Sequence, residues 1–375
     1  MAIFLDNAST TKPDKEVIKE MNTALDDFYG NPSSTHSIGR KVKAELENAK
    51  HKIAKLINCN SSDIIFTSGG TESNNQILYS NIIWGNIKTV ITSRIEHQSV
   101  LETLIKLKEK NNFELIYLNL DENGCIDYTE LEIKLNQNTH VLVSLMHGNN
   151  EIGNLLNLNL VAKLCEKYNA LFHTDCSQTL GFYELDFKNS SIDFASFSAH
   201  KLHGPKGVGF IYAKNKKNIH SFIFGGNQQA GLRSGTENLP AILGLTKSIE
   251  IAYNNLLKDK THIVSLKNYA IREIKKIFPT IIFNGNCLED ESKNHYKILS
   301  ILLPFKNNLI GFQLDLKGIC ISQGSACSSG SSKTSHVIKE LNNNLENTTP
   351  IRISFSKNNN TTDIDALINA LKEVI

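Results

Sequence analysis

Long hydrophobic runs are missing from this sequence. Nowhere in its 375 residues does an apolar stretch approach the roughly 18–20 residues that are needed to cross a bilayer. The first residues, Met1 to Leu5, are interrupted by Asp6, and no signal-peptide pattern follows. We therefore expect a cytoplasmic protein that has no membrane partner.

An excess of charge of either sign is also missing. The 40 Lys and Arg residues against 38 Asp and Glu residues leave a formal net charge of +2, which gives no reason to expect direct nucleic-acid binding. A hydrophobic content of 40% and a charged content of 21% are ordinary for a globular protein. The length of 375 residues favours two domains over a single core.

Cysteine pairing patterns are absent as well. The seven cysteines are odd in number and contain no C-x-x-C pair, which argues against a disulfide framework and against a structural zinc site, so we expect no metal. Six of them stand among larger apolar or strand-forming neighbours, and we predict that they are buried thiols. These six are Cys59, Cys125, Cys165, Cys176, Cys287 and Cys320.

The seventh cysteine, Cys327, has different surroundings. Residues 322–332 are nearly all Ser, Gly or Ala and offer almost no apolar area to bury, which predicts a surface loop. Core packing does not explain a cysteine there. A thiol on such a loop could attack in one place and deliver in another once it is a thiolate, so we predict a functional role for Cys327.

What the first two thirds of the chain contain is an alternation of short apolar runs and amphipathic stretches such as residues 100–110 and 158–168. This alternation is typical of an α/β domain with a mainly parallel sheet. The seven predicted strands lie at residues 63–67, 88–92, 114–120, 140–146, 170–174, 193–198 and 207–213.

The last third has a different pattern, which predicts a second, smaller α+β domain from about residue 256. Residues 237–278 are apolar at helical spacing and nearly free of helix breakers. A final helix is predicted near the C-terminus, with Thr362 and Asp365 as its capping box. Two strands are predicted at residues 298–303 and 351–355.

A candidate phosphate site follows the first predicted strand. Gly69 and Gly70 stand between this strand and a helix-compatible stretch. Paired glycines let backbone N–H groups approach an anion, and a helix N-terminus is electropositive. A tight turn before a helix gives the same pattern. This pattern by itself therefore does not distinguish a phosphate site from a plain turn.

A lysine and an aspartate follow two later strands. Lys201 follows closely after the predicted strand at residues 193–198. Burying a lysine costs free energy unless the amine is paired or forms a covalent bond to an aldehyde cofactor. Asp175 could pair with a pyridinium nitrogen, or it could simply cap a helix. Because ligands bind at the carboxyl ends of parallel strands, the placement of Gly70, Asp175 and Lys201 at such ends favours one shared site.

Taken together, the motifs resemble the NifS/IscS-type cysteine desulfurases of the class V aminotransferase superfamily. The resemblance covers essentially the whole chain, and nine short motifs in order make it specific. The motifs lie at residues 5–11, 30–34, 67–73, 96–97, 149–153, 198–201, 204–207, 233–236 and 324–327.

The resemblance implies a fold-type-I α/β architecture for pyridoxal-phosphate enzymes and a homodimer. A large cofactor domain with a mainly parallel seven-stranded sheet would cover residues 15–255. A small α+β domain would comprise residues 1–14 and 256–375 and would carry the cysteine loop at about 322–335. The alanine before Cys327 and the long run of small residues resemble the mobile-loop group of the family.

The resemblance also assigns roles to single residues. Lys201 matches the lysine that bonds to pyridoxal 5'-phosphate, Asp175 the partner of its pyridinium nitrogen, and His97 the stacked imidazole that is a candidate acid or base. Cys327 matches the persulfide-forming nucleophile. The remaining matches are Asn150 and Gln178 at the ring substituents, Gly70, Thr71, Ser198 and His200 at the phosphate, Thr236 at the phosphate of the other subunit, and Arg352 and Asn31 at the substrate.

The implied reaction converts L-cysteine to L-alanine and leaves the sulfur on Cys327 as a persulfide. An iron–sulfur scaffold protein or a tRNA thiolation enzyme would accept it, and the sequence does not say which. Family members that serve the scaffold usually continue in a C-terminal tail, whereas this sequence stops at Ile375. Gly148 and Ala199 replace residues that are usual in the family, and we expect activity to survive both changes.

Three alternatives stay open. A selenocysteine lyase would act little on cysteine, and a class V aminotransferase would not need Cys327. A non-catalytic sulfur-relay or scaffold subunit could keep the fold, although the presence of Lys201 and Asp175 argues against it.

Overall fold

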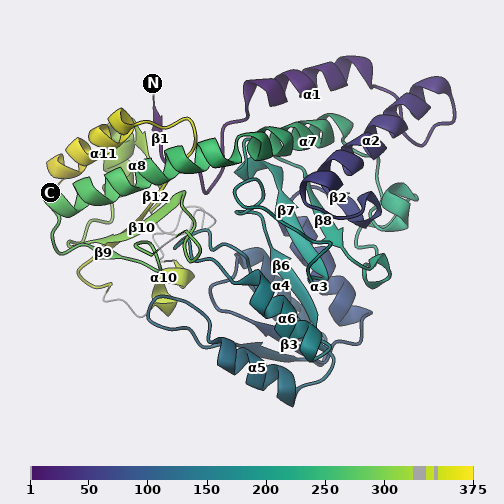
Figure 1. The fold of residues 1–375 in the computed structure, drawn as a ribbon, viewed down its shortest axis with the longest axis horizontal. Helices are drawn as coiled ribbons and strands as arrows, with labels where there is room; N and C mark the ends of the chain where they lie inside the picture. The colour runs from purple at the N-terminus through teal and green to yellow at the C-terminus, as the bar shows by residue number, and fades with distance from the viewer. Residues whose placement is uncertain (1, 290, 324–334, 342–344, 375) are drawn as a thin grey trace.

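The structure is a computed structural model that describes residues 2–289, 291–323, 335–341 and 345–374. Figure 1 shows two parts: a large sheet between helices, and a smaller sheet beneath the long helix α8 (Leu256–Ile277). Cys327 lies outside the described residues.

The large part is built on a seven-stranded sheet. All seven strands predicted from the sequence are confirmed, in the spatial order β2-β8-β7-β6-β5-β3-β4. Only β8 runs antiparallel to its neighbours, so the other strands of this sheet share one direction and end at the same edge. The strands are β2 (Ile64–Thr67), β3 (Thr89–Thr92), β4 (Glu114–Tyr117), β5 (Val141–Ser144), β6 (Leu171–Asp175), β7 (Phe194–Ser198) and β8 (Gly209–Ala213).

Helices cover this sheet because their apolar residues recur at helical spacing. In α2 (Ser37–Leu56), for example, Val42, Leu46, Ala49 and Ile53 are buried along one face. They join the core that also holds Phe172 and Phe197 of the sheet. The other helices of this part are α1 (Lys15–Asp27), α3 (Gly70–Ile83), α4 (Gln98–Lys108), α5 (Tyr128–Gln137), α6 (Leu158–Lys167) and α7 (Leu239–Asn254).

The smaller part has a hydrophobic core of its own, in which Leu5 from the N-terminal end packs with residues of the last third. Its three-stranded antiparallel sheet has the order β12-β10-β9, and a two-stranded parallel sheet joins β1 to β11. The domain boundary near residue 256 stays a prediction. The elements are β1 (Ile3–Phe4), β9 (Ile282–Phe283), β10 (Ile298–Leu303), α9 (Ile310–Leu316), β11 (Ile319–Cys320), α10 (His336–Glu340), β12 (Thr349–Ser354) and α11 (Thr361–Glu373).

The predicted capping box of the last helix is wrong by two residues. The N-cap of α11 is Asn360, whose side chain accepts a hydrogen bond from the backbone N–H of Asp363, while Asp363 accepts one from the backbone of Asn360. Thr362 and Asp365 therefore lie inside the helix. Both pairs fit the spacing of the motif, and the sequence alone did not distinguish them.

The burial predicted for six cysteines holds for three of them. Cys165, Cys176 and Cys287 are buried. The prediction is wrong for Cys59, Cys125 and Cys320, which are partly exposed. Cys59 lies in a turn after α2, Cys125 in the loop before α5, and Cys320 on the short strand β11.

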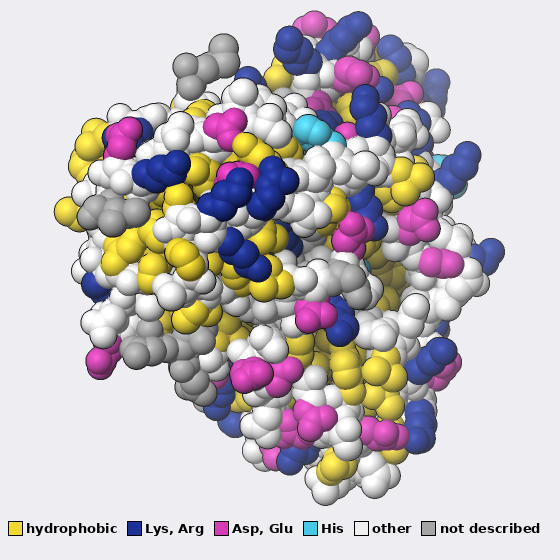
Figure 2. Space-filling model, turned by 60° about the vertical axis from the view of Figure 1, so that its left-hand side comes forward, with side chains coloured by type: hydrophobic (Ala, Val, Ile, Leu, Met, Phe, Trp, Pro, Cys, Tyr) yellow, Lys and Arg dark blue, Asp and Glu magenta, His cyan; other side chains and the backbone are white. Residues whose placement is uncertain are grey.

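The surface carries charges of both signs. Figure 2 shows acidic and basic side chains over much of the face seen from the side of the smaller part, in keeping with the net charge of +2. Among the helices of the described residues, none is long and apolar enough to cross a membrane.

Candidate active site

A cavity of about 340 Å³ lies at the edge of the large sheet where β2, β3, β5, β6 and β7 end. The segment that follows each of these strands contributes side chains to its wall. The cavity thus brings together most of the site residues predicted from the sequence. These are Gly70, Thr71, His97, Asn150, Asp175, Gln178, Ser198, His200, Lys201 and Arg352.

Three predicted site residues are not in this wall. Thr236 is exposed in the loop that precedes α7, and Asn31 is exposed in the loop between α1 and α2. Cys327 lies outside the described residues. The cavity of this chain therefore forms without Thr236 and Asn31.

The backbone at the start of α3 forms the predicted cradle. Gly69, the N-cap, has a φ of 151°, a conformation that favours glycine. A Cβ atom on Gly70 would lie 2.7 Å from Ser177 Oγ, so a side chain there would have to displace Ser177. The N-terminus of a fourteen-residue helix thus opens onto the cavity, where it favours an anion.

Lys201 lies in the 3₁₀ turn Ala199–Lys201 directly after β7. Its Nζ donates hydrogen bonds to Ala8 O at 2.8 Å and to Ser9 O at 2.6 Å. The amine is therefore held between two backbone carbonyls at the cavity wall.

Asp175 and His97 are joined by a chain of buried polar side chains. Asn74, fully buried on α3, donates from Nδ2 to Asp175 Oδ2 at 2.7 Å and to Ser99 Oγ at 2.8 Å. Ser99 Oγ lies 2.7 Å from His97 Nδ1. Asp175 Oδ1 also accepts the backbone N–H of Ser177 at 2.9 Å, so both carboxylate oxygens are oriented.

The pKa values of two histidines of the cavity are lowered by their surroundings. Burial lowers the pKa of His97; the charge of Asp175 opposes this shift, and that of Lys201 adds to it. Since His97 Nδ1 accepts the backbone N–H of Ser99 at 3.1 Å, the neutral ring carries its proton on Nε2. For His200, burial and then the charge of Lys201 lower the pKa to about 4.

Arg352 reaches the cavity from β12 of the smaller part. Its Nη2 pairs with Asp6 Oδ1 at 2.7 Å and contacts Ser9 Oγ at 2.6 Å. Its Nη1 donates to Asn150 O at 2.7 Å. The guanidinium is therefore buried and oriented by groups on both parts of the molecule.

Two buried polar atoms of residues in the cavity wall have no hydrogen-bond partner among the residues that the structure describes. They are Gln178 Oε1 and Arg352 Nε. Buried polar groups are nearly always paired in folded proteins, so such atoms indicate a polar ligand. The helix N-terminus for an anion, the lysine for an aldehyde and the oriented aspartate for a ring nitrogen fit pyridoxal phosphate.

The chain on either side of residues 324–334 is linked to the same cavity, on one side directly and on the other through Arg352. Before this stretch, Ser322 pairs through its backbone with Arg352, at 2.9 and 3.2 Å. After it, His336 lines the cavity, accepts from Gln98 Nε2 at Nδ1 and donates from Nε2 to Glu96 O. The residues that flank the segment of Cys327 are therefore both linked to the site.

The sequence did not point to Asn74, Ser99 or His336. Asn74 and Ser99 each follow a recognised motif by one or two positions, at residues 67–73 and 96–97, which is the one signal that could have found them. Nothing in the sequence marks His336. A second cavity, of about 890 Å³, is larger but holds none of the predicted site residues in its wall.

Comparison with known proteins gives consistent matches. The family model for class-V aminotransferases matches residues 3–367. Cysteine desulfurase IscS of Dictyoglomus turgidum is 39% identical over 346 residues, which cover 92% of this chain and 86% of that protein. A solved NifS-like protein has a TM-score of 0.91 at 32% identity, over 100% of this chain and 99% of that one.

A further solved structure shows SspA in complex with cysteine. It has a TM-score of 0.79 at 27% identity and covers 94% of this chain and 99% of that chain.

Proposed function

The chain belongs to the class-V aminotransferase family and, within it, to the cysteine desulfurases, and on this premise we propose that it converts L-cysteine to L-alanine. The observation that carries the proposal is the convergence of Lys201, Asp175, His97 and Arg352 on one cavity. On one side of the segment of Cys327, His336 lines this cavity, and on the other side Ser322 pairs with the backbone of Arg352.

The proposed reaction balances without an oxidant. The thiolate of Cys327 attacks the sulfur of the substrate, an S–S bond forms, and the C–S bond of the substrate breaks. The carbon that is released takes up a proton, so that one cysteine gives one alanine and one persulfide. When bound, pyridoxal phosphate supplies the electron sink that makes this C–S cleavage possible.

The residues of the chain bind and move protons around that step. Arg352 offers guanidinium donors that suit the carboxylate of the substrate. Lys201 takes the proton from the α-carbon, and His97 can donate its Nε2 proton within the cavity. Asp175, kept in place by Asn74 and Ser177, would pair with the ring nitrogen of the cofactor.

Support for Cys327 comes from the other cysteines. A thiol attacks as the thiolate, and a raised pKa suppresses that form. Burial raises the pKa of Cys59 and of Cys176 to about 12. The pKa values of Cys165, Cys287, Cys125 and Cys320 are also raised, in each case chiefly by burial.

We further propose a homodimer in which Thr236 completes the phosphate site of the partner subunit. Thr236 is exposed, and its segment is tied to the start of α3 by the ion pair of Arg233 with Glu72 at 2.9 Å. A sulfur-acceptor protein, for iron–sulfur cluster assembly or tRNA thiolation, and a cytoplasmic location remain parts of the proposal.

The test is the release of alanine from L-cysteine by the holoenzyme in the presence of a thiol reductant. We expect Cys327→Ser to lose turnover while it keeps the cofactor absorbance, and Cys59→Ser, the control, to keep both. Full turnover by Cys327→Ser would instead support the aminotransferase or the selenocysteine lyase, which L-selenocysteine as substrate then separates.

A further inference from the structure

Residues 6–9, here called the N-terminal turn, contact three side chains of the proposed site. Ala8 O accepts hydrogen bonds from Lys201 Nζ at 2.8 Å and from Gln178 Nε2 at 2.9 Å. Ser9 O accepts from Lys201 Nζ at 2.6 Å. The turn is therefore part of the wall and not merely the start of the chain.

The side chains of the turn bind the third residue, Arg352. Asp6 Oδ1 accepts from Arg352 Nη2 at 2.7 Å and from Ser9 Oγ at 2.8 Å, and Ser9 Oγ in turn accepts from Arg352 Nη2 at 2.6 Å. The Arg352 side chain is 7% exposed and that of Asp6 is 20% exposed. A three-membered network of this kind fixes the plane of the guanidinium.

The turn itself is firmly held by the smaller part. The backbone N–H of Ala8 donates to Ser354 Oγ at 2.8 Å, and Asn7 Nδ2 donates to Ser354 O at 2.8 Å. The preceding strand β1 pairs with β11. Because these anchors belong to β11 and β12, the turn is held by the same part of the molecule that carries Arg352.

The pairing of Arg352 engages both of its terminal nitrogens. Nη2 donates to Asp6 and Ser9, Nη1 donates to Asn150 O, and Nε is buried with no partner among the described residues. We propose that Asp6 is a positioning residue for the carboxylate of the substrate: its ion pair fixes the plane of the guanidinium at the cavity wall and so directs the donors of Arg352 toward an α-carboxylate. This inference rests on the proposed function.

Asp6 also determines which class of ligand the Asp6–Arg352 pair, here called the clamp, accepts. The pair of Asp6 and Arg352 is neutral overall, so the clamp recognises a carboxylate by the direction of its donors and not by excess positive charge. The expected ligand class is an amino acid whose carboxylate meets the guanidinium of Arg352 while its amine faces Lys201. The affinity for an amine that lacks a carboxylate should not depend on Asp6.

The test measures equilibrium binding to the holoenzyme through the change in cofactor absorbance. The two probes are L-alanine, which lacks the sulfur, and ethylamine, which lacks the carboxylate. For Asp6→Asn we expect binding of L-alanine to weaken by about 10- to 100-fold, the effect of losing a charge-assisted contact. Ethylamine binding should stay within about twofold. Asp26→Asn, an exposed site on α1, is the matched control.

Three results would overturn the inference. If Asp6→Asn weakened the binding of both probes equally, the cause would be a general structural defect. Tighter binding of L-alanine would mean that Asp6 competes with the substrate for Arg352. Unchanged binding would mean that Asp6 has no role in carboxylate recognition. If Asp6→Asn does not fold, Ser9→Ala, which removes only the bridge, should weaken L-alanine alone to a smaller extent.

A double variant separates this inference from the proposed function. In an Arg352→Gln background, Asp6→Asn should weaken L-alanine no further, because its effect passes through the guanidinium. An additive loss in the double variant would contradict the inference. This comparison of probes stays readable even if L-cysteine is not the substrate.

Discussion

Two lysines lie next to each other in this molecule in different settings. Lys201 lines the cavity and is half-buried, whereas Lys297, at the seam between the two sheets, is 0% exposed. Their link is a long hydrogen bond of 3.4 Å from Lys297 Nζ to Lys201 O. Lys297 is more deeply buried, yet the proposed reaction uses Lys201. A reacting amine needs access to the substrate as well as an environment of low polarity, and only Lys201 of the two lines the cavity.

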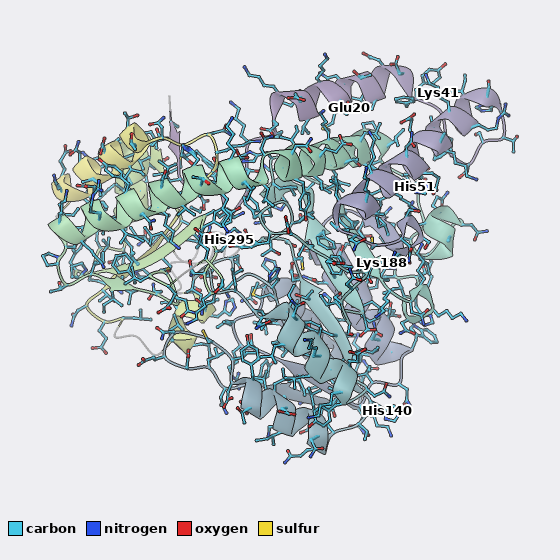
Figure 3. The ribbon with its side chains drawn as sticks, in the orientation of Figure 1. Glu20, Lys41, His51, His140, Lys188 and His295 are labelled. Atoms are coloured by element: carbon cyan, nitrogen blue, oxygen red, sulfur yellow. The ribbon has the colours of Figure 1, made fainter. Side chains whose placement is uncertain are left out.

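The neighbours of Lys297 explain its state. Its Nζ lies 3.9 Å from the centre of the Phe182 ring, and no ion pair to a carboxylate occurs among the described residues. Burial lowers the pKa of Lys297 well below the ordinary value, and the charges of Lys201 and Arg352 lower it further. Figure 3 labels the neighbouring His295 in the interior between the small and the large sheet.

The sharpest way to break this comparison is to remove each amine in turn. We expect Lys201→Ala to lose alanine formation by on the order of 10³-fold or more, because both the covalent and the proton-transfer role disappear. Lys297→Met should keep turnover and cofactor absorbance. If both variants lost turnover equally, the opening of the cavity would not distinguish the two lysines.

A smaller loss is expected from Asp175→Asn, which keeps the shape but removes the charge that is held by Asn74 and Ser177. We predict that kcat falls on the order of 10²-fold, as when one preorganised electrostatic group is lost, with a change in the cofactor absorbance. Asp193→Asn is the control, since Asp193 accepts the N–H of Phe172 at 2.8 Å at the opposite end of these strands. Loss of turnover in the control would point to damage of the sheet instead.

The smallest effect concerns stability at Lys297. Lys297→Met replaces a buried amine by an apolar chain of similar length, and we expect the free energy of unfolding to rise by about 1–3 kcal/mol at neutral pH. It is measured by denaturant unfolding of the holoenzyme at several pH values. A loss of stability would show that the contacts to Phe182 and Lys201 outweigh desolvation.

The pH dependence of this effect has a definite sign. Because the folded-state pKa of Lys297 lies below its unfolded value, the unfolded chain binds more protons between the two values, and stability rises with pH across that window. Above the unfolded value, the penalty of burying a charge is gone. The advantage of Lys297→Met should therefore shrink as the pH rises towards about 10.

The sequence was most informative where chemistry follows a strand. Gly70, Asp175 and Lys201 were placed together because parallel strands end at one edge, and this rule needs no knowledge of side-chain contacts. The seven strands followed from apolar runs alone. Such local patterns survive folding because each is decided within a few residues.

Contacts between distant residues were beyond that reasoning. Asp6 and Arg352 are 346 positions apart, and no spacing predicts their ion pair. Lys297 stands beside an apolar strand, where its sequence context fits a solvated lysine equally well. Asn74 lies on a helix that is buried on several sides, so its role depends on what Asp175 and Ser99 bring to it.

The ion pair of Asp6 with Arg352 also sets the order in which the protein can be made functional. During translation the N-terminal turn leaves the ribosome 346 residues before Arg352. Until then the large sheet can form around Lys201 while the turn and the guanidinium are still apart. Closure of the loop between Asp6 and Arg352 is therefore a late step. A nascent chain that contains Lys201 but not yet Arg352 lacks the proposed binding group for the carboxylate of an amino acid.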